Sequence, residues 1–140
     1  MNIKAADASS KQALPFFTSP VAAGFPSTAT DEIESKIDLN QHIIKHPAAT
    51  FFVRVQGESM KDAGINTEDL LVVDRSLEAK PGDIILAVID GEFTVKKIYK
   101  QDDKFFLKAE NESYELIELT EEMDFKIWGV VTNVIKTLNK

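Results

Sequence analysis

Residues 82–99, GDIILAVIDGEFTVKKIY, contain the strongest local indication of the fold. The run 84–89 is apolar and rich in β-branched residues, and a second run, 92–99, contains further β-branched and aromatic residues. Only Asp90 and Gly91 separate the two runs, and a two-residue Asp-Gly connection is typical of a tight antiparallel hairpin. We therefore predict a β-hairpin here. The preceding KPGD has proline and glycine at the central positions of a turn, as type II turns prefer.

The chain on both sides of this hairpin carries further segments of the same kind. The additional predicted strands are TFFVRV at 50–55, LLVVD at 70–74, KFFLKA at 104–109 and FKIWGVVTNVIK at 125–136. With the hairpin they give six or seven strands. Short strands at this spacing indicate an all-β, barrel-like or sandwich domain.

The N-terminal part of the chain differs in composition from the rest. Residues 1–31 are rich in Ala, Ser, Thr and Pro without helical or strand periodicity, so we predict an extended, flexible arm there and a β domain over residues 32–140. A short helix should open the domain. Asp38 can cap it, Gln41 follows three residues later as in a capping box, and Pro47 should end it.

Composition excludes several classes of protein. The chain has 140 residues, of which 44% are hydrophobic and 28% charged, as expected of one soluble globular domain. No apolar run is long enough to cross a membrane and no signal-peptide core is visible, so we expect a cytoplasmic protein. The absence of cysteine excludes disulfides, a thiol nucleophile and thiolate metal ligands. A net charge of −7 disfavours direct binding to DNA and suggests that any action on nucleic acid goes through another protein.

Several candidate sites have a simpler structural interpretation. His42 and His46 are four residues apart on the predicted helix and could form half of a metal site, but no third ligand is indicated nearby. We therefore favour a solvated helix face and predict no metal and no cofactor. An acidic run is interpreted as a solvated loop, and an aromatic cluster as core or dimer interface. These two groups are Glu118, Glu121, Glu122 and Asp124, and then Phe125, Ile127 and Trp128.

The stretch VQGESM, residues 55–60, suggests covalent chemistry. Ser59 follows a predicted strand on a loop that leaves the sheet, and a serine hydroxyl becomes a good nucleophile only when a base removes its proton. With histidine confined to the predicted helix, the available base is a lysine. Its pKa would have to fall from about 10.4 to about 7, a bias of roughly 4–5 kcal/mol. Lys96 and Lys97 point to opposite faces of the strand at 92–99, and periodicity does not choose between them.

Two motifs together give the sequence a family resemblance. GESM at 57–60, followed by LLVVDRSLEAKPGDIILAVIDGEFTVKKI at 70–98, resembles the LexA-like self-cleaving serine peptidases, and within them the UmuD-like accessory subunits of error-prone translesion polymerases. The likeness runs from about Leu14 to Leu138. It implies a mainly β, LexA/signal-peptidase-like barrel-type domain with an extended N-terminal arm and one short helix. Glu58 stands where an aspartate is common in such proteins, a conservative departure.

The resemblance also implies roles for particular residues. Ser59 would be the nucleophile and Lys96 the general base, and Lys97 would have no catalytic part. Proteins of this kind cut their own arm at a small residue followed by glycine, which here implies the bond between Ala23 and Gly24. A small side chain can lie close to the serine, and glycine permits the bent conformation that attack requires. Flanking apolar pockets would hold Val21 and Phe25.

The partners follow from the resemblance as well. It implies a homodimer whose self-cleavage is stimulated by a RecA filament on single-stranded DNA in the SOS response. The processed dimer would then serve as accessory subunit of a UmuC-type translesion polymerase. No helix-turn-helix motif precedes the arm, so we expect no sequence-specific DNA binding. The alternatives are a non-catalytic polymerase-interaction module, a LexA-like repressor fragment, and a signal peptidase, which the missing membrane anchor disfavours.

Overall fold

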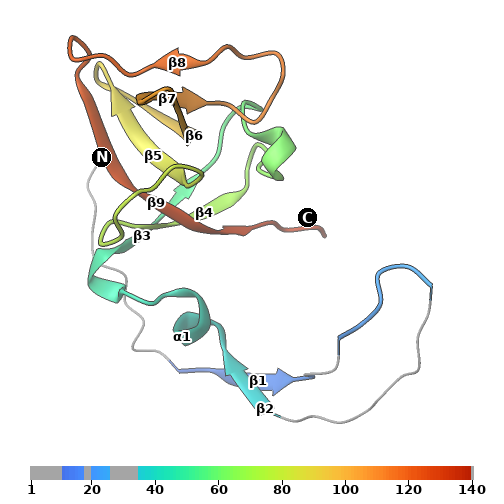
Figure 1. The fold of residues 1–140 in the computed structure, drawn as a ribbon. Helices are drawn as coiled ribbons and strands as arrows, with labels where there is room; N and C mark the ends of the chain where they lie inside the picture. Colours follow the sequence, from blue (N-terminus) through green and yellow to red (C-terminus); the bar gives the residue numbers. More distant parts are fainter. Residues whose placement is uncertain (1–10, 18–19, 26–34, 140) are drawn as a thin grey trace.

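The computed structural model describes residues 11–17, 20–25 and 35–139, and it is mainly β, as the sequence predicts (Figure 1). The strands of the larger sheet are β3 (Thr50–Arg54), β4 (Leu70–Asp74), β5 (Ile84–Ile89), β6 (Glu92–Gln101), β7 (Lys104–Lys108), β8 (Ile117–Glu118) and β9 (Phe125–Ile135). They pair antiparallel in the order β3-β4-β9-β5-β6-β7-β8. The last long strand of the chain therefore joins the two halves of the sheet.

The predicted central hairpin is confirmed. β5 and β6 pair from Ile84 to Ile89, and Asp90 and Gly91 form the connection with φ values of 49° and 85°. Positive φ at both central residues is the mark of a type I′ turn, whose twist matches that of the strands. The turn before β5 is also confirmed, because Gly82 has φ of 96° and the N–H of Asp83 donates to the carbonyl of Lys80 at 2.9 Å.

Two clusters of buried apolar side chains form the core. One gathers Phe51, Met60, Ile65, Leu71, Val73 and Leu86, and the other Ile85, Ala87, Ile98, Leu107 and Val130. β9 runs close to β4 where Gly129 lies, and a Cβ there would meet Val73 Cγ1 at 2.5 Å. A side chain at position 129 would therefore force Val73 or the neighbouring backbone to shift.

A second, two-stranded sheet consists of two strands that sequence analysis missed. β1 (Ala13–Phe16) pairs antiparallel with β2 (Ser35–Asp38), although β1 lies inside the predicted arm. All four side chains of β1 are exposed, and its sequence, ALPF, has no alternation of apolar and polar residues that would indicate a half-buried strand. The division into an arm over residues 1–31 and a domain over 32–140 stays a prediction.

The predicted helix is present but ends earlier than expected. α1 (Leu39–Ile43) is capped by Asp38, whose Oδ1 accepts the N–H of Asn40 at 3.0 Å, as predicted. Pro47 does not end this helix; it opens the 3₁₀ helix η1 (Pro47–Ala49), and Lys61–Ala63 form a second one, η2. Since His46 follows α1 in a non-helical conformation, the prediction that the two histidines share a helix face is wrong. Among the described residues, no helix has the length and apolar character needed to cross a membrane.

Candidate active site

Ser59 lies on the turn between β3 and η2. Gly57 adopts φ of 107°, which a residue with a side chain rarely does, and turns the chain out of the strand. The N–H of Lys61 closes the turn by donating to the carbonyl of Glu58 at 3.2 Å. Met60 is only 2% exposed and belongs to the first core cluster. The buried methionine therefore anchors the turn and holds the neighbouring serine at the edge of the core.

Lys96 reaches the same place from β6. Its Nζ lies 3.1 Å from Ser59 Oγ, 2.7 Å from Thr94 Oγ1 and 3.2 Å from the carbonyl oxygen of Val95. All three partners are neutral, and among the described residues no ion pair to Lys96 occurs. Burial lowers the pKa of Lys96, because a low-dielectric surrounding disfavours the charged ammonium.

Lys97 points away from this site. Its Nζ pairs with Glu110 Oε1 at 3.1 Å, on the opposite face of β6. Strand alternation thus separates two adjacent lysines that periodicity alone could not distinguish. The structure brings Ser59 and Lys96 together and places Lys97 elsewhere.

A cleft of about 340 Å³ opens beside Ser59. One wall is the chain that leaves β3, residues 53–57, and the other is the start of β6, residues 93–95. Buried side chains of the first core cluster, among them Met60 and Leu86, form part of its lining. The lining thus combines apolar side chains with the hydroxyl of Ser59, which Lys96 Nζ contacts at 3.1 Å.

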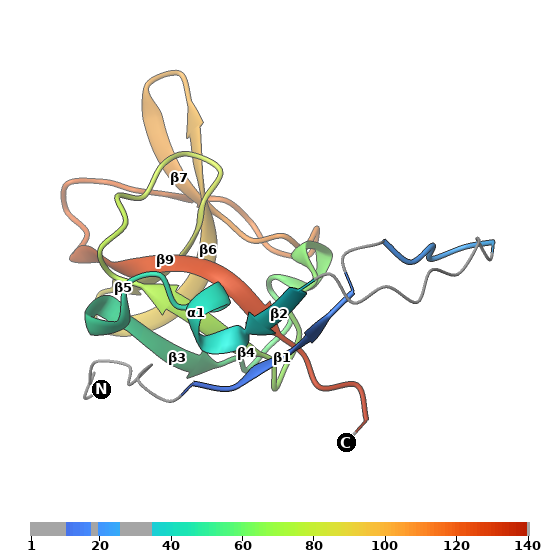
Figure 2. The ribbon, with the colours of Figure 1, turned by 90° about the horizontal axis from the view of Figure 1, so that it is seen from below.

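The predicted cleavage bond lies outside this cleft. Ala23 and Gly24 are exposed, and the flanking Val21 and Phe25 are 90% and 94% exposed. In both ribbon views this segment projects away from the larger sheet (Figures 1 and 2). The structure therefore does not bring the bond to Ser59, and the two apolar side chains occupy no pocket in this arrangement.

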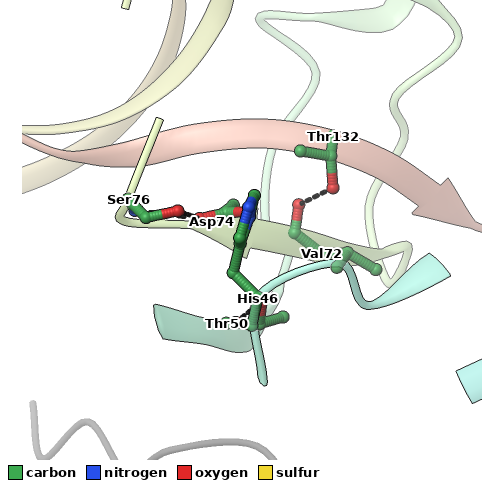
Figure 3. Close-up of polar contacts among 6 residues, drawn as sticks. All are labelled: His46, Thr50, Val72, Asp74, Ser76 and Thr132. Carbon is green, nitrogen blue, oxygen red and sulfur yellow. Dashed lines mark hydrogen bonds and ion pairs between the residues drawn. The ribbon is translucent and has the colours of Figure 1, made fainter. Parts of the chain in front are cut away.

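A second polar cluster was missed by sequence analysis (Figure 3). His46 Nδ1 lies 2.6 Å from Asp74 Oδ2, and Asp74 Oδ1 accepts from the N–H of Ser76 at 2.8 Å and from its hydroxyl at 2.6 Å. Burial, the largest influence, raises the pKa of Asp74, but the hydrogen bonds from Ser76 and His46 outweigh it and leave the pKa lowered. Because Ser76 donates to the aspartate and not to the histidine, the cluster is no Ser-His-Asp relay.

This cluster has a structural role that the separation of its residues in the sequence does not reveal. His46 and Asp74 are 28 residues apart, and no local motif links them. The hydroxyl of Thr50 also donates to the carbonyl of His46 at 2.7 Å. Together these contacts fix the segment that leads from α1 into β3 to the end of β4.

The remaining candidate residues make no contact with Ser59 or with the amine of Lys96 among the described hydrogen bonds and ion pairs. Within the described ranges, no three His, Cys, Asp or Glu side chains gather as metal ligands would. Glu118 lies 3.7 Å from Lys104, at the exposed edge of the sheet. Trp128 packs against the first core cluster, in an edge contact with Phe93 and with the guanidinium of Arg75 5.1 Å from its ring centre. The expectation that Trp128 contributes to the core is confirmed.

Comparison with known proteins identifies the family. Residues 15–132 match the family described as Peptidase S24-like. Protein ImpA of Escherichia coli is 49% identical over 121 residues, which cover 86% of this chain and 82% of ImpA. Protein SamA of Salmonella typhimurium strain LT2 is 46% identical over 121 residues, 86% of this chain and 84% of SamA.

Two relatives with lower identity support the same family. Protein MucA of Escherichia coli is 38% identical over 137 residues, which cover 90% of this chain and 86% of MucA. The LexA repressor of Psychromonas ingrahamii is 40% identical over 118 residues, 84% of this chain but only 56% of that repressor. The chain therefore belongs to the Peptidase S24-like family of serine peptidases, as a UmuD-like member.

Proposed function

We propose that the protein is an SOS-mutagenesis peptidase that cuts its own chain between Ala23 and Gly24, with Ser59 as nucleophile and Lys96 as general base. The observation that carries the proposal is the 3.1 Å contact between Lys96 Nζ and Ser59 Oγ, made by a lysine whose pKa is lowered by burial. A neutral amine within hydrogen-bonding reach of a hydroxyl is the arrangement that activates a serine without histidine.

The reaction follows from these positions. Neutral Lys96 takes the proton of Ser59 as Oγ attacks the carbonyl carbon of Ala23, and the oxyanion that forms accepts a hydrogen bond from the backbone N–H of Ser59. The bond to nitrogen then breaks, and the Lys96 ammonium gives its proton to the leaving amine of Gly24. Water, deprotonated by Lys96, attacks the acyl-enzyme, and as the ester bond breaks the Lys96 ammonium returns the proton to Ser59 Oγ. The residues up to Ala23 leave as a carboxylic acid, which ionises in water.

The shape of the cleft supports a substrate with small side chains. Its volume of about 340 Å³ holds a few residues of extended chain, and its walls come from the segments 53–57 and 93–95. Because the segment with the cleavage bond is exposed and projects from the sheet, it must move to reach Ser59. The cleft that receives it belongs to the same chain or to a second copy. In this proposal residues 1–31 are the arm and residues 32–140 the peptidase domain.

The wider role is proposed from the family. Self-cleavage is stimulated by a RecA filament on single-stranded DNA, and the shortened homodimer serves a UmuC-type translesion polymerase in the cytoplasm. The net charge of −7 supports contact with nucleic acid through these proteins, because an acidic surface repels the phosphate backbone. The reaction itself uses only side chains and water, so no cofactor is required.

The test is to map the product of self-cleavage. Purified protein is incubated at pH 9–10, and separately near pH 7.5 with RecA, ATP and single-stranded DNA, and the fragments are identified by mass spectrometry. We expect a large fragment that begins at Gly24, and an intact chain for Ser59→Ala. Cleavage by Ser59→Ala would exclude Ser59 as nucleophile. An intact wild-type chain under both conditions would favour the non-catalytic polymerase-interaction module.

A further inference from the structure

The loop after β7 contacts the turn that carries Ser59 at three points. The N–H of Asp62 donates to the carbonyl of Glu110 at 2.8 Å, and the N–H of Glu110 lies 3.3 Å from Met60 Sδ. The third contact joins Asn111 Nδ2 to the carbonyl of Glu58 at 2.8 Å. The partners are about 50 residues apart in sequence, so these contacts are tertiary and brace the turn from outside its own segment.

The amide of Asn111 is held in one orientation. Asn111 is only 8% exposed, and its side-chain Oδ1 accepts a hydrogen bond from the N–H of Ser113 at 3.0 Å. A backbone N–H can only donate and the carbonyl of Glu58 can only accept, so the oxygen must face Ser113 and the nitrogen must face Glu58. An aspartate would satisfy the first contact and place an oxygen against the carbonyl in the second.

The carbonyl that Asn111 holds belongs to the same peptide unit as the N–H of Ser59. The peptide is planar and trans, so its C=O and N–H point in opposite directions, and fixing one fixes the other. We propose that Asn111 is a positioning residue that orients the peptide between Glu58 and Ser59, so that its N–H points at the oxyanion of the self-cleavage reaction. This inference rests on the proposed function and assigns one new residue to it.

The other hydrogen bonds of the turn explain why the contact from Asn111 matters. Besides Asn111, the carbonyl of Glu58 accepts only the N–H of Lys61 at 3.2 Å among the described hydrogen bonds. Without Asn111 only the longer contact from Lys61 restrains this peptide, and we expect the N–H of Ser59 to be less well aligned with the developing charge. Loss of one oxyanion donor costs about 10²–10³-fold in rate, which sets the scale for Asn111.

The experiment compares Asn111→Asp and Asn111→Ala with wild type and with Glu110→Gln. Glu110→Gln alters the same loop but keeps the two contacts that the backbone of Glu110 makes. The rate of release of the Gly24 fragment is measured from pH 7 to 10.5, and the backbone amide of Ser59 is observed by NMR in Lys96→Ala versions of each chain. Thermal unfolding shows whether each variant is folded.

The expected result is a plateau rate about 10²-fold lower for both Asn111 variants, with an unchanged pH midpoint and a shifted Ser59 amide resonance. Glu110→Gln should match wild type in plateau rate, pH midpoint and Ser59 resonance. A folded Asn111→Asp that cleaves within threefold of wild type, or keeps its Ser59 resonance, overturns the role of Asn111 while the proposed function stands. A moved pH midpoint would mean that Asn111 acts through Lys96 instead. If wild type releases no fragment, the proposed function fails, and the role of Asn111 in it fails too.

Discussion

Lys96 and Lys97 are adjacent on β6, yet they lie in opposite chemical surroundings. Lys97 has the carboxylate of Glu110 at 3.1 Å, whereas Lys96 contacts two hydroxyls and a carbonyl and is buried enough for its pKa to be lowered. A carboxylate stabilises the ammonium form, and burial without one favours the neutral amine. The comparison shows that two adjacent lysines differ in their tendency to be neutral because one has a carboxylate partner and the other is buried without one.

The sharpest test of this comparison is to remove each amine in turn. Lys96→Ala should lower the self-cleavage rate by at least about 10³-fold, because the serine then has no base. Lys97→Ala removes the same number of atoms from the next position and should cleave within about twofold of wild type. Intact-mass measurement over a time course at pH 9 gives both rates. Equal losses in the two variants would mean that the faces of β6 do not differ in function.

A carboxylate added beside Lys96 should make it resemble Lys97. Thr94 Oγ1 lies 2.7 Å from the amine, so Thr94→Asp places a negative charge next to it. An adjacent carboxylate raises a lysine pKa by about 1–2 units, and the rate at pH 8 should then fall by about 10–100-fold.

The pH profile separates this effect from simple damage to the site. Below the pKa of Lys96 the rate should rise about tenfold per pH unit, and it should level off above that pKa, since only the neutral amine acts as a base. Thr94→Asp should move this midpoint upward, and the uncharged Thr94→Asn should not. A lower rate with the same midpoint in Thr94→Asp would show that charge is not the controlling factor.

The burial of Lys96 should also cost stability, in a pH-dependent way. Its pKa is lower in the folded than in the unfolded chain, so between those two values the unfolded state binds more protons and stability rises with pH. Below the folded pKa the full penalty remains. Lys96→Met should therefore be more stable than wild type at pH 6–7, by on the order of 1 kcal/mol for a side chain that keeps some solvent contact.

Urea unfolding in a Ser59→Ala background, which prevents self-cleavage, measures this difference. The advantage of Lys96→Met should shrink as the pH rises from the folded pKa of Lys96 toward about 10.4. Lys97→Met, which removes a paired lysine, should give no such gain. A constant difference between Lys96→Met and its parent at all pH values would contradict the assigned cause.

The smallest effect is expected on the other face of β6. Glu110→Gln breaks the ion pair with Lys97, in which both side chains are partly exposed. Such pairs contribute about 0.2–1 kcal/mol and are screened by salt. Urea unfolding in 50 mM and 500 mM NaCl should show a loss of at most that size, and a smaller one at high salt. A loss above 2 kcal/mol would show that this ion pair contributes more than a partly exposed pair should.

The sequence predicted the elements whose signals are local. The Asp90-Gly91 connection and the proline and glycine of KPGD define their turns through backbone preferences of single residues, and both turns are present. The N-cap at Asp38 is equally local and is also present. The end of α1 was misplaced because Pro47 disfavours helical conformation only at the residue before it and does not determine where an earlier helix ends.

Features that depend on tertiary contacts could not be predicted in this way. The contact of His46 with Asp74 and that of Asn111 with Glu58 join residues 28 and 53 positions apart, and nothing in either segment marks its partner. Ser59 and Lys96 were singled out by residue type and family resemblance. Periodicity left Lys96 and Lys97 open and only the resemblance favoured Lys96, because their surroundings depend on the register of β6 against β5 and on the placement of the turn after β3.

The pairing of β1 with β2 has a consequence for the shortened chain. β1 ends at Phe16, before the bond between Ala23 and Gly24, and β2 begins at Ser35, after it. Cutting that bond would sever the covalent link between the two strands, and departure of the fragment would leave the backbone edge of β2 without its neighbour. An unpaired edge is a template for another strand. Proteolysis would then expose an additional backbone edge, on the side of β2 that β1 occupies in the uncut chain, as well as remove a segment.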